Sequence, residues 1–226
     1  MQMERKLYDA NLRMLEVELE LAGFPDDVTW DLRQEMPWGW RERFLVEYET
    51  KAFGFSLKGV LYFQQLLVND AYRFSSFDVA LVGEVNALTV KCSFPRVKGY
   101  SVGLREAINL MHGRPVFRDY RFDPLQQGYW LELRQKTDKG EFTLARNRST
   151  FNTHAALDDA LFGKRLGAAD RNVLADQLDL GDRAKMHLVG KDFFMEVDLA
   201  HERLVLTNVQ GKPAKINWWD VFLKRK

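Results

Sequence analysis

Hydrophobic positions recur at two spacings along the chain, and each spacing predicts a different kind of element. Near the start they recur every three or four residues, the spacing of one face of a helix. This pattern predicts a helix over residues 4–22, ended by Gly23 and Pro25. Its docking face consists of Tyr8, Leu12, Leu15, Leu19 and Ala22. A shorter helix is expected over residues 29–36.

Apolar residues then recur at every second position, as they do in a strand with one buried face. Phe44, Val46 and Tyr48 share one face with glutamates opposite, and Gly54 marks a turn. The return strand presents a second apolar face, made of Phe55, Leu57, Gly59, Leu61 and Phe63. Two more extended stretches are expected, over residues 72–82 and 87–94.

The segment of residues 101–119 has the clearest helix signal. Its apolar stripe comprises Leu104, Ala107, Ile108 and Met111. We expect the polar Asn109 to face away from this stripe. Gly103 can serve as the N-cap, with Glu106 placed to reach back to its amide. Gly113 and the proline two residues after it end the helix.

The later half repeats the same signals in shorter pieces. A hairpin is expected over residues 129–146, with Tyr129, Leu131 and Leu133 on its buried face. Helices are expected near residues 153–162 and 170–178, and Asp170 would cap the second. Residues 116–121 are expected to be extended, and the chain closes with a meander of short strands over 184–189, 193–199, 204–208 and 214–219.

Short loops between strands predict an α+β fold, with antiparallel sheets built from hairpins and helices packed on one face. Helices precede hairpins near residues 43–63, 129–146 and 193–208, which suggests a degenerate helix-plus-hairpin repeat. The alternative is an ordinary α+β order that alternates by chance. The best candidate boundary, residues 82–86, separates a helix-plus-hairpin region (1–84) from an α+β region (85–226). Because no Pro/Gly/Ser-rich linker joins them, we expect one compact unit.

Composition narrows the class of protein without naming an activity. The chain has 226 residues and a net charge of +1, so no overall field favours nucleic acid or a membrane. No stretch resembles a secretory leader or a membrane span. Cys92 is the single cysteine and cannot form an intramolecular disulfide, which favours the cytoplasm.

Motifs for catalysis, metals or cofactors are missing from the sequence. The four histidines and Cys92 form no zinc-ligand spacing, and no nucleophile elbow or phosphate loop occurs. The adjacent carboxylates Asp26–Asp27 and Asp158–Asp159 are interpreted as residues near helix starts, where they favour the dipole. We therefore expect no catalytic residue, metal or cofactor.

One local excess of charge is the candidate site. Between residues 91 and 121, seven Lys and Arg face only Glu106 and Asp119, and aromatic residues lie among them. Basic side chains beside aromatics can hold phosphates and stack bases. The alternative is a solvated surface balanced by acids elsewhere, such as those at residues 16, 18 and 20. The candidate anion or nucleic-acid residues are Lys91, Arg96, Lys98, Arg114, Arg118 and Arg121.

Several segments resemble an uncharacterised bacterial family common in Bacteroidetes. The resemblance rests on FSSFDVAL (Phe74 to Leu81), GLREAINLMHGR (Gly103 to Arg114) with Val116, and YWLEL (Tyr129 to Leu133). It extends from about Tyr48 to the C-terminus. Members of that family often occur in or near mobile genetic elements. No catalytic residues are known for the family, so the resemblance assigns none to this chain.

Together these observations favour a cytoplasmic, non-enzymatic binding or accessory module linked to a mobile element. Its ligand would be a protein partner or nucleic acid. One alternative is an enzyme with an unrecognised site. Another is a homo-oligomeric module that pairs exposed strand edges or the tryptophans Trp38, Trp40, Trp218 and Trp219.

The nucleic-acid version makes a direct prediction. Binding should weaken steeply with salt, because bound cations are released. Replacing Arg114 and Arg118 by Ala should lower the slope of log affinity against log salt by about one for each arginine. Titration of single- and double-stranded probes at several salt concentrations measures this, and absent or salt-independent binding would contradict it.

Overall fold

The computed structural model confirms an α+β fold. It describes residues 5–37, 41–66, 71–82, 92–96, 101–119, 128–135, 142–160, 166–188 and 191–214. Within these ranges it contains five α-helices and three antiparallel sheets. The chain divides into a first unit, residues 1–112 with 134–144, and a second unit, residues 113–133 with 145–226.

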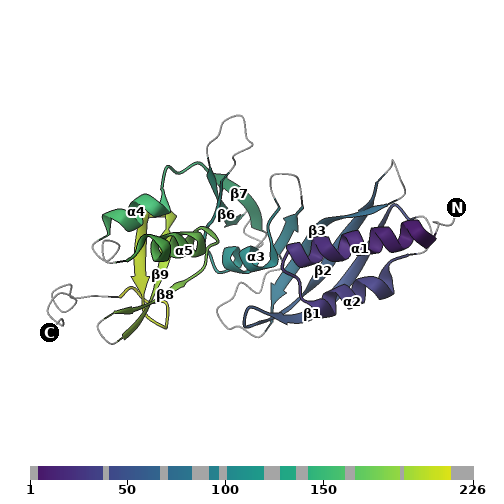
Figure 1. Ribbon diagram of the computed structural model, residues 1–226, viewed down its shortest axis with the longest axis horizontal. Coiled ribbons are helices and arrows are strands. Elements are labelled where there is room, and N and C mark those ends of the chain that lie inside the picture. Colours follow the sequence, from purple (N-terminus) through teal and green to yellow (C-terminus); the bar gives the residue numbers. More distant parts are fainter. Residues whose placement is uncertain are drawn as a thin grey trace. The chain divides into compact units, whose positions relative to one another are not determined.

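The first unit is built on a four-stranded antiparallel sheet in the order β1-β2-β3-β4 (Figure 1). Its elements are α1 (Arg5–Leu21), α2 (Asp26–Glu35), β1 (Arg43–Ala52), β2 (Phe55–Gln65), β3 (Tyr72–Leu81), β4 (Cys92–Pro95) and α3 (Leu104–Met111). In Figure 1, α1 and α2 lie side by side on one face of the sheet. Helix α1 packs against β3 and α2 against β1. The predicted helices and the first hairpin are therefore confirmed.

A two-residue turn sets the register of β1 and β2. Phe53 and Gly54 both have positive φ angles, 53° and 84°. Two such residues match the right-handed twist of the strands on either side. The turn pairs Ala52 with Phe55, and the same register continues to Arg43 and Gln64. Every second residue of β1 from Phe44 to Thr50 is therefore buried, as its pattern predicts.

Phe24 joins the helices to the sheet. It follows α1, beyond Gly23, and is 5% exposed. Its ring meets those of Tyr48, Phe74 and Phe77 edge-on, with centroids 5.5, 5.9 and 5.2 Å away. Edge-to-face contacts of this kind add to the free energy gained by burial. The Gly23 turn that ends α1 thus also positions the centre of the core.

Helix α3 follows the sequence prediction at both ends. The Gly103 amide donates to Glu106 Oε2 at 2.7 Å, and Gly113 has a φ of 75°. The predicted apolar stripe is buried. Asn109, expected to face away from the stripe, is nevertheless only 4% exposed. The α3 surface is buried well beyond the stripe, because both Glu106 and Asn109 are enclosed as well.

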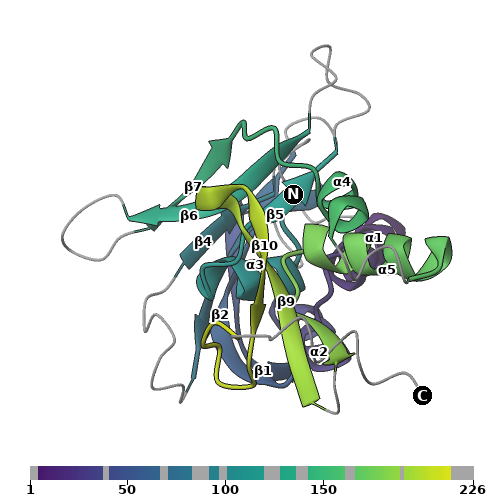
Figure 2. The same ribbon diagram turned by 90° about the vertical axis from the view of Figure 1, so that its left-hand side faces the viewer.

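The second unit holds two three-stranded antiparallel sheets, in the orders β5-β6-β7 and β10-β9-β8. Its elements are β5 (Val116–Arg118), β6 (Tyr129–Gln135), β7 (Phe142–Asn147), α4 (Thr153–Asp159), α5 (Ala168–Asp179), β8 (Ala184–Leu188), β9 (Lys191–Asp198), a 3-10 turn η2 (Leu199–His201) and β10 (Arg203–Thr207). The ends of β6 and β7 belong to the first unit. Helices α4 and α5 lie beside each other, α4 packed against β10 and α5 against β8 and β9 (Figure 2).

The structure corrects the expected alternation in β6. Tyr129, Trp130 and Leu131 are all buried, whereas alternation would leave Trp130 exposed. The Trp130 ring packs against Phe117 and Phe151, with centroids 5.2 and 5.9 Å away. Its indole N–H donates to the Phe151 carbonyl at 3.3 Å. Both faces of this strand are covered there, so its burial no longer alternates.

Two expectations about helix ends are also wrong. The N-cap of α5 is Gly167, and Asp170 lies in the first turn instead. Asp158 and Asp159 lie at the end of α4 rather than near its start. There Asp158 forms an ion pair with Arg171, 2.6 Å away. The helix dipole does not stabilise a carboxylate at the C-terminus. The charge of Asp158 is instead stabilised by the Arg171 guanidinium.

The expected boundary at residues 82–86 differs from the observed division. Strands β3 and β4, on either side of it, pair in one sheet, and the chain passes from one unit to the other after residues 112, 133 and 144. The helix-plus-hairpin repeat stays a prediction. The described sheets comprise one of four strands and two of three strands. Outside the described residues lie most of 82–86, residues 87–91, the turn at 138–140, the strand end at 120–121, most of 214–219 and the four tryptophans of the homo-oligomer alternative.

Gly59 is the position where a side chain is least tolerable. A Cβ built there would lie 1.9 Å from the Asp78 carbonyl oxygen and 2.8 Å from the Tyr48 hydroxyl oxygen. We expect Gly59→Ala to lower the free energy of unfolding by about 3 kcal/mol, because backbone must move. Urea unfolding measures this. The neighbouring exposed Lys58→Ala should change it by less than about 0.5 kcal/mol, and equal effects would contradict the account.

Candidate functional site

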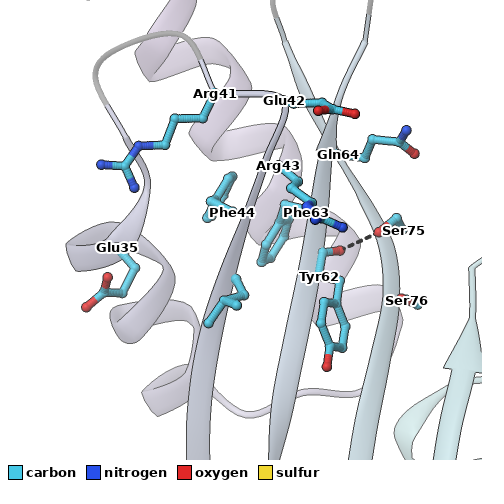
Figure 3. Close-up of a pocket in the computed structure, with 11 residues that line it drawn as sticks. Glu35, Arg41, Glu42, Arg43, Phe44, Tyr62, Phe63, Gln64, Ser75 and Ser76 are labelled. Atoms are coloured by element: carbon cyan, nitrogen blue, oxygen red, sulfur yellow. Dashed lines mark hydrogen bonds between the residues drawn. The ribbon is translucent and has the colours of Figure 1, made fainter.

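A cleft of about 800 Å³ lies at the end of the first unit where β1 begins (Figure 3). It includes the side of the sheet that faces away from α1 and α2. Its lining mixes hydroxyl, amide, charged and aromatic side chains. The lining residues are Glu35, Arg41, Glu42, Arg43, Phe44, Leu45, Tyr62, Phe63, Gln64, Ser75 and Ser76.

Strand alternation places these side chains. Phe44 and Phe63 stack with ring centroids 4.6 Å apart on the covered face, where they form the apolar end of the core. Arg43 is paired with Gln64, and Leu45 with Tyr62, on the opposite face. Leu45 remains 53% exposed there. The open face of the sheet thus presents apolar, amide and cationic side chains close together, on neighbouring cross-strand pairs.

A register shift in β2 and β3 adds two hydroxyls. The shift falls between Tyr62 and Phe63, so that Ser75 is the extra residue of β3. The Ser75 hydroxyl donates to the Tyr62 carbonyl at 2.8 Å, and both Ser75 and Ser76 reach the cleft (Figure 3). Such irregularities commonly redirect side chains beside binding sites.

Tyr62 is held by a buried carboxylate. Its hydroxyl donates to Asp78 Oδ2 at 2.7 Å, and Ser93 donates to the other oxygen. Asp78 is 4% exposed. A buried carboxylate needs such donors, because the loss of hydration is costly. The Tyr62 ring therefore has a fixed position on the floor of the open face.

The charges of the cleft are of both signs. In Figure 3, the Arg41 side chain extends over the α2 side near Glu35, whereas Arg43 lies over the sheet near Tyr62. Glu42 lies far from Glu35 in the same view. A lining with charges of both signs suits a ligand that itself carries both polar and charged groups better than it suits a phosphate.

The sequence-predicted basic residues are distributed over both units. Arg96 belongs to the first unit, and Arg114 and Arg118 belong to the second. Both arginines of the second unit are half-buried. The remaining predicted residues, Lys91, Lys98 and Arg121, lie outside the described residues, as do Tyr100 and Tyr120.

Arg96 has an internal role. Its guanidinium lies over the Phe74 ring at 5.2 Å, and its backbone amide donates to the Ser75 carbonyl. Burial lowers the pKa of Arg96, while the charges of Glu18 and Glu106 oppose that shift. Glu18 also accepts a hydrogen bond from the Phe74 amide at 3.1 Å. This arginine is thus engaged with the Phe74 ring of β3, close enough to carboxylates of α1 and α3 to feel their charge.

The described residues that line this cleft include no histidine and no cysteine. Within the described ranges, no group of three His, Cys, Asp or Glu side chains has the geometry of a metal site. Cys92 is buried in β4, and burial, followed by the charge of Asp78, raises the pKa of its thiol to about 11. No helix of the described residues is long and apolar enough to cross a membrane.

Sequence reasoning missed the residues of the cleft. The alternation that assigned Leu61 and Phe63 to the core also places Tyr62 and Gln64 on the opposite face. An aromatic residue on a solvent-facing side of a strand was the available signal. The contributions of Ser75 and Glu35 had no such signal, because they depend on the register shift and on where α2 packs.

Comparison with known proteins adds no assignment. No protein-family model matches the chain, and no curated protein or solved structure matches it either. The resemblance stated from the sequence therefore stays an expectation.

Cys92 offers a test of the described β4 environment. At pH 8 its alkylation by iodoacetamide should be roughly a hundredfold slower in the folded protein than in concentrated guanidinium chloride. The reason is that a pKa of about 11 leaves far less thiolate than the ordinary value of 9.0. Mass spectrometry over time measures the rates. Equal rates in both states would show that the thiol is accessible and unshifted.

Proposed function

We propose that the chain is a non-enzymatic binding module whose partner is another protein, bound on the first unit at the cleft of Figure 3. The observation that carries the proposal is the composition of the lining. Tyr62, Arg41, Arg43 and the exposed Leu45 combine aromatic, cationic and apolar surface within one concave region. Tyr and Arg are the residues that most often dominate the binding energy of protein interfaces.

The charge balance favours a protein over nucleic acid. Glu35 and Glu42 accompany Arg41 and Arg43 in the lining. Nucleic-acid affinity depends on cations that neutralise successive phosphates, and carboxylates beside them oppose it. The nucleic-acid version would instead use Arg114 and Arg118, and it is tested separately by the salt titration above.

Rigidity also supports recognition at this place. Tyr62 is anchored through Asp78, and Gln64 receives a hydrogen bond from Arg73 at 3.2 Å. Side chains held before binding lose less conformational freedom on binding, which improves affinity. The accessory role in a mobile element, which the sequence resemblance implies, is part of this proposal.

Site-specific photo-crosslinking tests the location. A benzophenone amino acid introduced at Leu45, which is 53% exposed, should give discrete protein adducts in cells that express the chain. The same amino acid at Val17 on α1 is a matched control, because that residue is 51% exposed and lies away from the cleft. Mass spectrometry identifies the adducts. The same adduct pattern at both positions, or none at Leu45, would contradict the proposal.

A further inference from the structure

Strand β1 forms an open edge of the first-unit sheet. In the part of the chain that the structure describes, β2 is the only strand paired with it. The Gln65 amide donates to the Glu42 carbonyl, and hydrogen-bonded pairs alternate along an antiparallel ladder. The even-numbered residues of β1 therefore pair with β2. The N–H and C=O groups of the odd-numbered ones point away from the sheet, at Arg43, Leu45, Glu47, Glu49 and Lys51.

Hollows follow this edge along its whole length. The cleft at the start of β1 shares Glu35 and Leu45 with a second hollow of about 310 Å³ between α2 and β1. A third hollow of about 550 Å³ continues along the edge at Glu49 and Lys51, beside the start of α2. An extended chain laid along β1 would pass through all three.

We call the three hollows together the β1 groove, and its walls are acidic. Its lining contributes three cations, Arg41, Arg43 and Lys51, against seven carboxylates. These carboxylates come from α2 and from β1 and its start, at Asp26, Asp27, Asp31, Glu35, Glu42, Glu47 and Glu49. The middle hollow has three of them and no cation. Of the charges in this groove, Asp27 is committed internally, since it accepts the Thr50 hydroxyl at 2.7 Å.

A second copy of the chain fits this edge poorly. In the two antiparallel registers with the longest overlap, Glu47 faces either its own copy or Glu49. Like charges directly opposite each other destabilise a strand pair. A segment rich in Lys or Arg would instead meet carboxylates on both sides, those of α2 on one face and those of β1 on the other.

We propose that β1 binds an extended, basic segment of a partner protein as an additional strand. The inference rests on the proposed function, and it names the chemistry and the binding mode of the partner. Backbone hydrogen bonds from the odd-numbered residues of β1 supply a sequence-independent part of the affinity, as in other cases of strand addition. The acidic groove selects for Lys and Arg side chains.

A synthetic peptide tests the mode directly. The probe is a labelled peptide of alternating lysine and threonine, ten residues long to match β1. Fluorescence anisotropy should show saturable binding that weakens as salt is added, because the contributing charges are screened. A glutamate–threonine peptide of the same length should not bind. A lysine–threonine peptide methylated on its backbone amides keeps its charge but cannot pair, and it should also fail to bind.

Variants with equal charge change separate the groove from the overall charge. Asp31→Asn combined with Glu47→Gln should weaken peptide binding roughly tenfold. Asp9→Asn combined with Glu20→Gln removes the same charge from α1 and should leave binding unchanged. Hydrogen exchange of the wild-type complex should show new protection at the Leu45, Glu47 and Glu49 amides.

Each other outcome overturns the inference in a distinguishable way. Equal binding of the methylated peptide would show that attraction is electrostatic without strand pairing. Binding that responds equally to the α1 variants would remove the groove. Concentration-dependent dimers that the peptide disrupts would show that a second copy occupies β1. Failure of every peptide, with the Leu45 crosslink present, would leave the proposed function standing without this mode.

Discussion

The hydrogen bonds to the buried residue Asp78 are the interaction on which the first unit depends. Its side chain accepts hydrogen bonds from Tyr62 of β2 and Ser93 of β4, and its backbone carbonyl accepts one from Tyr48 of β1 at 3.0 Å. One residue of β3 thereby links all four strands. Removing one donor would leave a carboxylate oxygen buried without a hydrogen bond. The free-energy cost of that is larger than the net stabilisation that one hydrogen bond contributes. The network is thus a constraint on strand register as much as a source of stability.

That constraint has consequences on both faces of the sheet. On the covered face, the Tyr48 hydroxyl can reach the Asp78 carbonyl only because Gly59 has no side chain between them. On the open face, the same residue fixes Tyr62 and so defines the floor next to the cleft. The recognition surface proposed for β1 therefore stands on a rigid sheet, whereas its polar edge remains available for pairing. Charged side chains along an edge usually prevent uncontrolled pairing, and here the same charges would restrict it to basic partners.

Capping residues, glycines and hydrophobic spacing predicted the elements correctly where tertiary packing did not override them. The ends of α3 followed from Gly103, Glu106 and Gly113, because capping and positive φ angles are local properties. The burial of Asn109 and Trp130 did not follow from the sequence pattern, because additional faces of their elements are covered, and periodicity along one element does not report this. The candidate basic residues stay a prediction: Arg96 lies over the Phe74 ring in the first unit, and Arg114 and Arg118 belong to the second.

The sequence by itself determined the α+β class, the antiparallel hairpins and the residues that end α1 and α3. These depend on interactions between residues a few positions apart, so the order of residues contains them. Only the tertiary structure decided that β1 forms an edge, that α2 brings four acids beside it, and that Ser75 reaches the cleft. Each of these depends on which elements pack together across dozens of residues. A charge pattern on one helix and one strand becomes a groove only when the fold places the two side by side.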